Sequence, residues 1–387
     1  MAIKELIRIK QSLFKDTPTQ GLEKLIYSHI KSFFLFNKVQ GFDVFYSEFL
    51  RHIDLRENNF LNNLIDHDEV NNIDKLGQEK KYSIYLKLMN LINNLQLGKH
   101  TTNYDSHCRE VFSDKVRFLF NKPYLDIILS SILRTHGYKF TTCSKVLITH
   151  DIDKISYVES IMALIRQIAG DILKRRMFYP QRILHIFTKR GVHKDLAKLI
   201  TENFSHVFLF LPNKSKIDAD YSPNIIKKLI LENNIKNVGL HYSYNCQNFE
   251  QFNREYDYVK EFCPTFVRGH YLRRSRASDS FISKHKLIDL TPYNISHGGF
   301  PNSTAYPILR TNKYGDSILT LGTNFMDTTF EIENPSSDEY AFEKFDQYLS
   351  LVKSTGGIFC FNWHNTSMFW GRWPRREFNY DNIIKRL

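Results

Sequence analysis

Long apolar stretches and paired cysteines are missing from this 387-residue chain. No apolar run approaches the roughly 18 residues that a membrane-spanning helix needs, so none is expected. The opening residues, MAIKELIRIKQSLF, lack the apolar segment of about 7–15 residues found in a secretory signal. The five cysteines cannot all pair and form no Cys-x-x-Cys motif, which favours a reducing compartment. We therefore expect a cytoplasmic protein, with peripheral contact at the inner membrane left open.

Fixed-period repeats and low-complexity tracts are also absent, and the composition is that of a globular protein. Hydrophobic residues make up 42% and charged residues 24% of the chain, which argues against disorder or a collagen-like structure. A net charge of +12 allows anionic partners such as phosphates, nucleic acid or a membrane surface. Because no nucleic-acid-binding motif is recognisable, we expect no nucleic-acid partner.

Two regions of the chain differ in their apolar pattern. Residues 1–135 are predicted to be mainly helical, with apolar residues at helical spacing in 22–34 and 85–92, and nothing indicates their role. In residues 136–387, short apolar runs alternate with helical patterns, which predicts an α/β fold built of βα units around a parallel sheet. The predicted strands are 146–149, 206–211, 238–240, 265–267, 287–290, 318–321 and 357–361. The predicted helices of this region are 156–174, 224–233, 249–262, 279–285, 338–352 and the segment from 380 on.

Reactive side chains follow these predicted strands, close to the point where each strand ends. They are His150, Asp151, Asp153, His241, Arg268, His270, Asp289, Asp327 and His364. In an α/β barrel the carboxyl ends of the strands carry the active site, so the recurrence predicts one site built from several loops. Taken singly, each residue could instead serve as a cap or turn residue.

Two short spacings suggest a metal site. Asp151 and Asp153 stand at i and i+2 and point the same way if the strand persists, so one could bind a metal while the other deprotonates a water. His241 and Asn245 stand at i and i+4 and would share a helix face, although an Asn carbonyl is a poor zinc ligand. The alternatives are an N-cap for the two aspartates and a hydrogen-bonded core histidine for His364.

Several short motifs occur in an order that resembles a known family. They are Thr149-His-Asp-Ile-Asp153, His241-Tyr-Ser-Tyr-Asn245, Arg268-Gly-His-Tyr271, Asp289-Leu-Thr291 and Phe361-Asn-Trp-His364. This string resembles the motifs of polysaccharide deacetylases with a NodB-homology domain, carbohydrate esterase family 4. It is most similar to the WbmS-like subgroup found with bacterial O-antigen or capsule biosynthesis. The resemblance covers the chain from about residue 146 to 370 and leaves roughly the first 130 residues unexplained.

The resemblance implies a distorted (β/α)7-type barrel in residues 136–387, preceded by the helical region. It also implies a bound divalent metal, with Zn²⁺ as the first expectation and Co²⁺ or Ni²⁺ as alternatives. Asp153 and His241 match metal ligands of the family. The third ligand of the family falls on Asn245, which departs from the expected His. The site could borrow His150 or His270 instead, or could be inactive.

The resemblance also implies the acid–base residues. Asp151 matches the general base, and Arg268 would orient it and keep it ionised, because a neighbouring positive charge lowers the pKa of a carboxyl group. His364 matches the general acid, with Asp289 or Asp327 holding its imidazole.

Substrate contacts are expected from His270, Tyr271 and Trp363, which lie in the third and last motifs. The implied substrate is an amino sugar or glycan with an N-acetyl or similar small acyl group, nucleotide- or lipid-linked. Basic-aromatic runs at 174–190 and 369–376 would suit a sugar diphosphate or an anionic membrane, or a plain solvated surface. The alternative to an enzyme is a catalytically inactive barrel that binds glycan or acts as an assembly protein.

Overall fold

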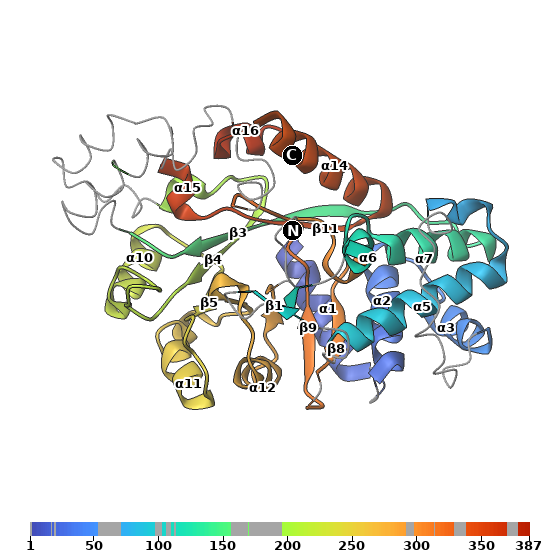
Figure 1. Ribbon diagram of the computed structural model, residues 1–387, viewed down its shortest axis with the longest axis horizontal. Helices are drawn as coiled ribbons and strands as arrows, with labels where there is room; N and C mark the ends of the chain where they lie inside the picture. The colour runs from blue at the N-terminus through green and yellow to red at the C-terminus, as the bar shows by residue number, and fades with distance from the viewer. Residues whose placement is uncertain are drawn as a thin grey trace.

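The computed structural model is an α/β protein, with a curled sheet and a helical region formed by the first third of the chain (Figure 1). The described residues are 2–16, 18, 21–52, 71–96, 103–105, 110–111, 114–155, 169, 196–291, 298–312, 314–328, 338–369 and 378–387. None of the helices in these ranges is both long and apolar enough to cross a membrane.

Within the described ranges, nine strands form one mixed sheet, in the order β10-β11-β3-β4-β5-β6-β7-β9-β8. Their bounds are β3 (Ser144–Ile152), β4 (Ser205–Phe210), β5 (Val238–Tyr242), β6 (Phe266–Gly269), β7 (Ile288–Asp289), β8 (Ile308–Thr311), β9 (Ser317–Thr320), β10 (Phe325–Met326) and β11 (Gly357–Asn362). All neighbours are parallel except β8 and β9. The described strands leave two ends, β10 and β8, so the sheet is a half-barrel and a (β/α)7 barrel is not confirmed.

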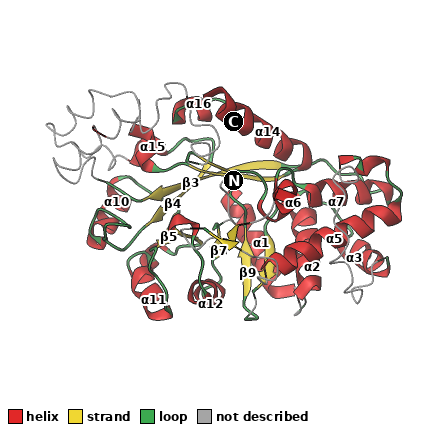
Figure 2. Ribbon diagram, viewed as in Figure 1, coloured by secondary structure: helices red, strands yellow, loops and turns green. Residues whose placement is uncertain are grey.

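Successive side chains on these strands pack into two different cores, as the twofold alternation of a strand requires. On β3, Leu147 belongs to one core and Ile148 to the other; on β4, Val207 and Phe208 divide in the same way. The second core is completed by the helices that follow the strands and surround the sheet (Figure 2). These are α10 (Ile226–Glu232), α11 (Phe249–Asp257), α12 (Arg276–Lys284), α14 (Asp338–Thr355) and α16 (Tyr380–Ile384), while the short α15 (Asn365–Phe369) follows β11.

The other core is shared between the sheet and the amino-terminal helices. Those helices are α1 (Ala2–Asp16), α2 (Gly21–Phe36), α3 (Phe42–Arg51), α5 (Gln78–Gln96), α6 (Asp114–Arg117) and α7 (Tyr124–Thr135), and the pair β1 (Asn103–Tyr104) and β2 (Glu110–Val111) lies between α5 and α6. Helix α2 lies against the edge strand β8, where Ser28 Oγ accepts the backbone N–H of Leu309 at 2.9 Å. Ser32 Oγ donates to the carbonyl of Pro307 at 2.7 Å. These bonds satisfy backbone groups that an uncovered edge would expose to another chain.

A buried carboxylate also joins the helical region to the sheet region. Asp126 on α7 is fully buried and accepts hydrogen bonds from His29 at 2.8 Å, Thr304 at 2.6 Å and the backbone of Ala305 at 2.8 Å. His29 also bonds the Tyr85 hydroxyl at 2.6 Å. A buried charge without such partners would be costly, so the two regions are coupled through their polar groups as well as their apolar core.

The expected division into helical and α/β regions is seen, and every predicted strand has a counterpart. The predicted helices 224–233, 249–262, 279–285, 338–352 and 380 on are also present, the first two partly as 3-10 turns. The helix predicted at 156–174 lies outside the described residues apart from residue 169. Strands β8 and β10 were missed, because their four and two residues carry too short an apolar pattern.

We expect the whole chain to respond to a change in the shared core. Phe33 on α2 is fully buried, with its ring centroid 5.3 Å from that of Phe140 and 5.1 Å from that of Tyr306. Phe33→Ala should lower the free energy of unfolding by about 3–5 kcal/mol in a single denaturant transition. Val44→Ala, at a 64% exposed position on α3, should change it by less than about 0.5 kcal/mol. A separate early transition confined to the helices would contradict the shared core.

Candidate metal centre and active site

Most of the reactive residues converge at the carboxyl ends of β3, β5, β6 and β11, which lie close together in the sheet order. In Figure 1 the arrowheads of β3 and β4 point towards α10 and α15, and α2, α5 and α7 lie at the opposite end of the molecule. The pairing of Thr149 with Asn362 and of His241 with Arg268 fixes the register of the strand ends. Parallel strands therefore bring motifs that are far apart in the sequence to one edge.

Three of these residues form a cluster that could hold a metal ion. The ligand atoms of Asp153, His241 and His270 all lie within 4.8 Å of one another. His241 Nε2 is 3.3 Å from Asp153 Oδ1, and His270 Nε2 is 3.9 Å from Asp153 Oδ2. Asp153 Oδ1 is buried and has no hydrogen-bond partner within the described ranges. A buried carboxylate oxygen facing two imidazoles matches the N and O ligands that zinc takes.

Both imidazoles are oriented by a second hydrogen bond. His241 Nδ1 lies 3.0 Å from the carbonyl of Arg268, and His270 Nδ1 lies 3.0 Å from a carboxylate oxygen of Asp218. Because both partners are acceptors, each Nδ1 donates a hydrogen bond, and each Nε2 is left facing the cluster. Asp218 is itself held by the backbone N–H of Tyr244 at 2.8 Å and by Ser215 Oγ at 2.9 Å. Such outer contacts are what metal-binding histidines usually need.

The structure does not bring Asn245 into this cluster. His241 is in β5 and Asn245 lies exposed in the turn that follows, so the two do not share a helix face as predicted. His150 is also excluded from the cluster, because it alternates to the other face of β3 and bonds His206 at 3.1 Å. Its burial, with His206 beside it, lowers the pKa of His150 to about 3 and keeps it neutral. His150 and His270 were the two alternatives to Asn245 as third ligand, and His270 is the one that lies in the cluster.

Arg268 is fully buried and bonds all of its side-chain donors. Nη1 donates to Asp151 Oδ1 and to Asn362 Oδ1, both at 2.7 Å, and Nη2 donates to Thr149 and Thr323 at 2.9 Å. Its Nε donates to the carbonyl of residue 290 at 3.2 Å. The predicted contact between Arg268 and Asp151 is therefore present, and it ties the ends of three strands together.

This arrangement keeps Asp151 ionised. Burial alone would raise the pKa of Asp151, but the Arg268 guanidinium, with His241 and His364, brings it below its ordinary value. Asn362 Nδ2 donates to the other carboxylate oxygen at 2.9 Å. Asp151 Oδ2 lies 3.9 Å from His241 Nε2, beside the candidate metal cluster. The carboxylate thus remains available as a proton acceptor in a site that solvent barely reaches.

His364 is held by Asp327, one of the two candidates for that role. Asp327 Oδ1 lies 2.6 Å from His364 Nδ1, and Oδ2 accepts the backbone N–H of His364 at 3.0 Å. Burial alone would lower the pKa of His364, but Asp327, together with Asp153 and Asp151, outweighs burial and raises the pKa to about 9. His364 Nε2 then faces the cluster, 3.8 Å from Asp151 Oδ2.

Asp289, the other candidate, does not hold His364. It pairs with Arg274 and lies 3.5 Å from Arg310 Nη2, and its Oδ1 accepts the backbone N–H of Thr291 at 2.8 Å. Asp289 is fully buried near the end of the short β7, where these two arginines neutralise it. Asp289 therefore contributes a structural ion pair and not a contact with His364.

The residues predicted to contact substrate fall into three different positions. Tyr271 is 40% exposed beside the cluster, with its ring centroid 4.5 Å from that of His270. His270 belongs to the cluster itself. Trp363 is only 1% exposed and packs against Phe378 and Tyr380, because it alternates away from the site after β11. The Trp363 side chain therefore lies in the second core and not beside the cluster.

Asp218 was missed by sequence reasoning, together with Asn362 and Thr323. Asp218 lies in the loop after β4, at the same edge of the sheet as the other strand-end residues. Its signal in the sequence is its position eight residues after the end of β4, within reach of the same edge of the sheet. The role of Asn362 depends on a hydrogen bond across the sheet, which no local pattern signals.

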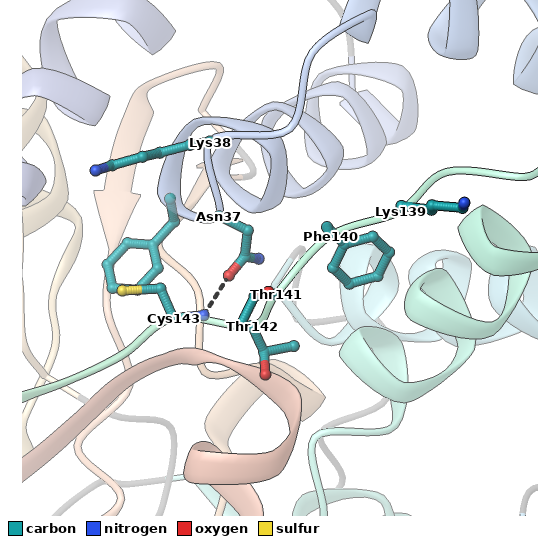
Figure 3. Close-up of a pocket in the computed structure, with 8 residues that line it drawn as sticks. Asn37, Lys38, Lys139, Phe140, Thr141, Thr142 and Cys143 are labelled. Carbon is teal, nitrogen blue, oxygen red and sulfur yellow. Dashed lines mark hydrogen bonds between the residues drawn. The ribbon is translucent and has the colours of Figure 1, made fainter.

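A pocket of about 680 Å³ lies away from this site (Figure 3). It is lined by Phe36, Asn37, Lys38, Lys139, Phe140, Thr141, Thr142 and Cys143, at the amino end of β3. A strand rises about 3.3 Å per residue, so the eight residues from Cys143 to Asp151 span about 26 Å. Asn37 Oδ1 accepts the backbone N–H of Cys143 at 2.7 Å, as the dashed line in Figure 3 marks. The pocket lies where α2 meets the sheet and contributes nothing to the cluster.

Comparisons with protein-family models, curated proteins and solved structures return no significant match. The chemistry of the site has to follow from the side chains that it contains.

Removing the charge behind His270 should weaken metal binding without unfolding the protein. Asp218→Asn keeps the size of the side chain but removes the carboxylate that orients His270, so Zn²⁺ affinity should fall by about 10- to 100-fold. Asp257→Asn, on an exposed position of α11, is the matched control and should leave affinity unchanged. Competition with a chromogenic chelator measures both constants. Equal affinities in the two variants would exclude this role for Asp218.

Proposed function

We propose that the protein is a metal-dependent N-deacylase that removes an acetyl or similar small acyl group from an amino sugar. The observation that carries the proposal is the three-residue cluster with Asp151 and His364 beside it. The motif resemblance to polysaccharide deacetylases supports the same reaction and suggests bacterial surface-polysaccharide biosynthesis as its setting. A relation of the half-barrel to the (β/α)7-type barrels of that family is part of the proposal.

Asp153, His241 and His270 would hold the divalent ion, most simply Zn²⁺, with Co²⁺ or Ni²⁺ as alternatives. When bound, such an ion polarises an amide carbonyl and lowers the pKa of a nearby water towards 7. Their two imidazole nitrogens and one carboxylate leave coordination positions open, as catalytic zinc sites require.

Asp151 and His364 supply complementary proton transfers. Asp151, held ionised by Arg268, accepts a proton from the water that attacks the carbonyl carbon. His364, whose pKa Asp327 raises, donates its proton to the amide nitrogen as the C–N bond breaks. The products are a carboxylate and a free amine. Two neighbouring groups with separated pKa values provide a base and an acid at the same pH.

The alternative of an inactive glycan-binding or assembly protein was motivated by Asn245 at the third ligand position. His270 supplies a nitrogen donor in its place, which removes that motive. The alternative remains an outcome of the activity test below.

Substitution of the acid and the base should separate turnover from metal binding. Asp151→Asn and His364→Gln should each lower the release of acetate from N-acetylated sugars by at least about 100-fold, because each removes one proton transfer. Both variants should keep their bound metal, since neither belongs to the three-residue cluster. Glu250→Gln, exposed on α11, is the control and should retain full activity.

Acetate release can be measured with a coupled assay and the metal by elemental analysis. Undiminished turnover in both Asp151→Asn and His364→Gln would exclude the proposed roles. A wild type that binds the ion and the sugar but releases no acyl group would favour the inactive binding protein.

A further inference from the structure

The chain bends sharply after β6 and holds a tyrosine beside the metal cluster. Tyr271 and Leu272 both have left-handed backbone conformations, with φ of +54° and +59°. The bend is close-packed: a Cβ on Gly269 would lie 2.1 Å from the carbonyl oxygen of Arg273, and the Tyr242 hydroxyl donates to that oxygen at 2.6 Å. Strained backbone of this kind is concentrated at functional sites. Here it keeps an aromatic ring 40% exposed beside His270.

A row of planar groups leads outward from the cluster along this bend. The ring of Tyr271 lies 4.5 Å from that of His270 and 5.4 Å from that of Tyr244. The guanidinium carbon of Arg273 lies 4.7 Å from the centre of the Tyr244 ring. Three ring contacts therefore connect His270 to the guanidinium of Arg273.

Arg273 is fixed in this position but retains donors for a ligand. Its Nη1 donates to the carbonyl of Tyr244 at 2.9 Å, and the guanidinium lies over the ring of the same residue. Arginine carries five N–H donors in a planar arrangement that matches phosphate and carboxylate oxygens. Unlike Arg268 and Arg274, Arg273 makes no ion pair with an acidic group of the described residues.

The neighbouring loop after β4 adds positive charge at the same edge. Lys214 and Lys216 are both exposed on this loop. The loop meets the bend through the contact between Asp218 and His270. The acidic groups of the loop face inward: Asp218 is buried against His270, and Asp220 accepts the backbone N–H of Ile155 at 2.8 Å. The loop therefore presents two lysines to solvent, while both of its carboxylates accept hydrogen bonds within the protein.

We propose that Arg273, stacked on Tyr244 next to the exposed Tyr271, binds a phosphate group of the amino-sugar substrate. The inference rests on the proposed function, because it names the substrate class of that site: a glycosyl phosphate rather than a neutral glycan. The exposed tyrosine ring covers a face of the sugar. The guanidinium binds phosphate oxygens at the outer end of the row. Arg273 determines specificity and takes no part in the proton transfers.

Binding can be tested without turnover by isothermal titration of the zinc-loaded Asp151→Asn protein. The probes are N-acetylglucosamine 1-phosphate and the neutral disaccharide of N-acetylglucosamine. We expect the phosphorylated sugar to bind at least tenfold more tightly. Adding Arg273→Gln should remove that preference while changing the affinity for the neutral sugar by less than twofold. Arg254→Gln, exposed on α11, is the matched control and should keep the preference.

Equal binding of the two probes, or a preference that survives Arg273→Gln, would overturn the inference. Circular dichroism spectra that match the wild type show that each variant is folded, so a change in affinity cannot be attributed to unfolding. If the wild type releases acetate but binds the two probes with equal affinity, the proposed function stands and this inference fails. If no acyl group is released yet the phosphate preference depends on Arg273, the subsite stands and the proposed reaction fails. Comparing a uridine diphosphate sugar with a short prenyl diphosphate sugar then identifies the carrier of the phosphate.

Discussion

The buried guanidinium of Arg268 is the interaction on which the site depends. A charge removed from water is tolerated only when its partners replace the lost hydration. Arg268 achieves this through five hydrogen bonds that reach Asp151, Asn362, Thr149, Thr323 and the carbonyl of residue 290. Because these partners come from β3, β11 and the chain segments after β7 and β9, the same bonds hold the strand ends in register and keep Asp151 ionised. Each of the five partners therefore replaces part of the hydration that the guanidinium loses.

The open sheet places a second demand on the fold. A closed barrel hides its strand edges, but a half-barrel has to cover them with other elements. Helix α2 covers β8 through Ser28 and Ser32, and the buried Asp126 anchors α7 to the loop around Thr304. The amino-terminal helices therefore contribute the part of the core that a complete barrel would have made from its own strands. This gives residues 1–135 a structural role that their composition alone did not suggest.

Sequence patterns located most of the site but not its finer assignments. Strand alternation was enough to place Asp151 and Asp153 on one side, and parallel strands were enough to bring His241 and His364 near them. The choice of Asn245 failed because it assumed a helix where β5 continues into a turn. Asp289 and Trp363 lie apart from the cluster, because a matching motif does not show which arginine or apolar cluster is close in space. Asp218, Asn362 and the open sheet depend on contacts between distant segments, which one sequence does not reveal.

The metal content of purified protein tests the central claim most directly. We would measure it by elemental analysis for wild type and for the Ala variants of Asp153, His241, His270 and Asn245. The geometry predicts about one divalent ion per chain, lost in the first three variants and retained in Asn245→Ala. Circular dichroism on each variant separates loss of the ion from loss of the fold. Wild type that takes up no zinc, cobalt or nickel, or a folded His270→Ala variant that keeps its ion, would contradict the account.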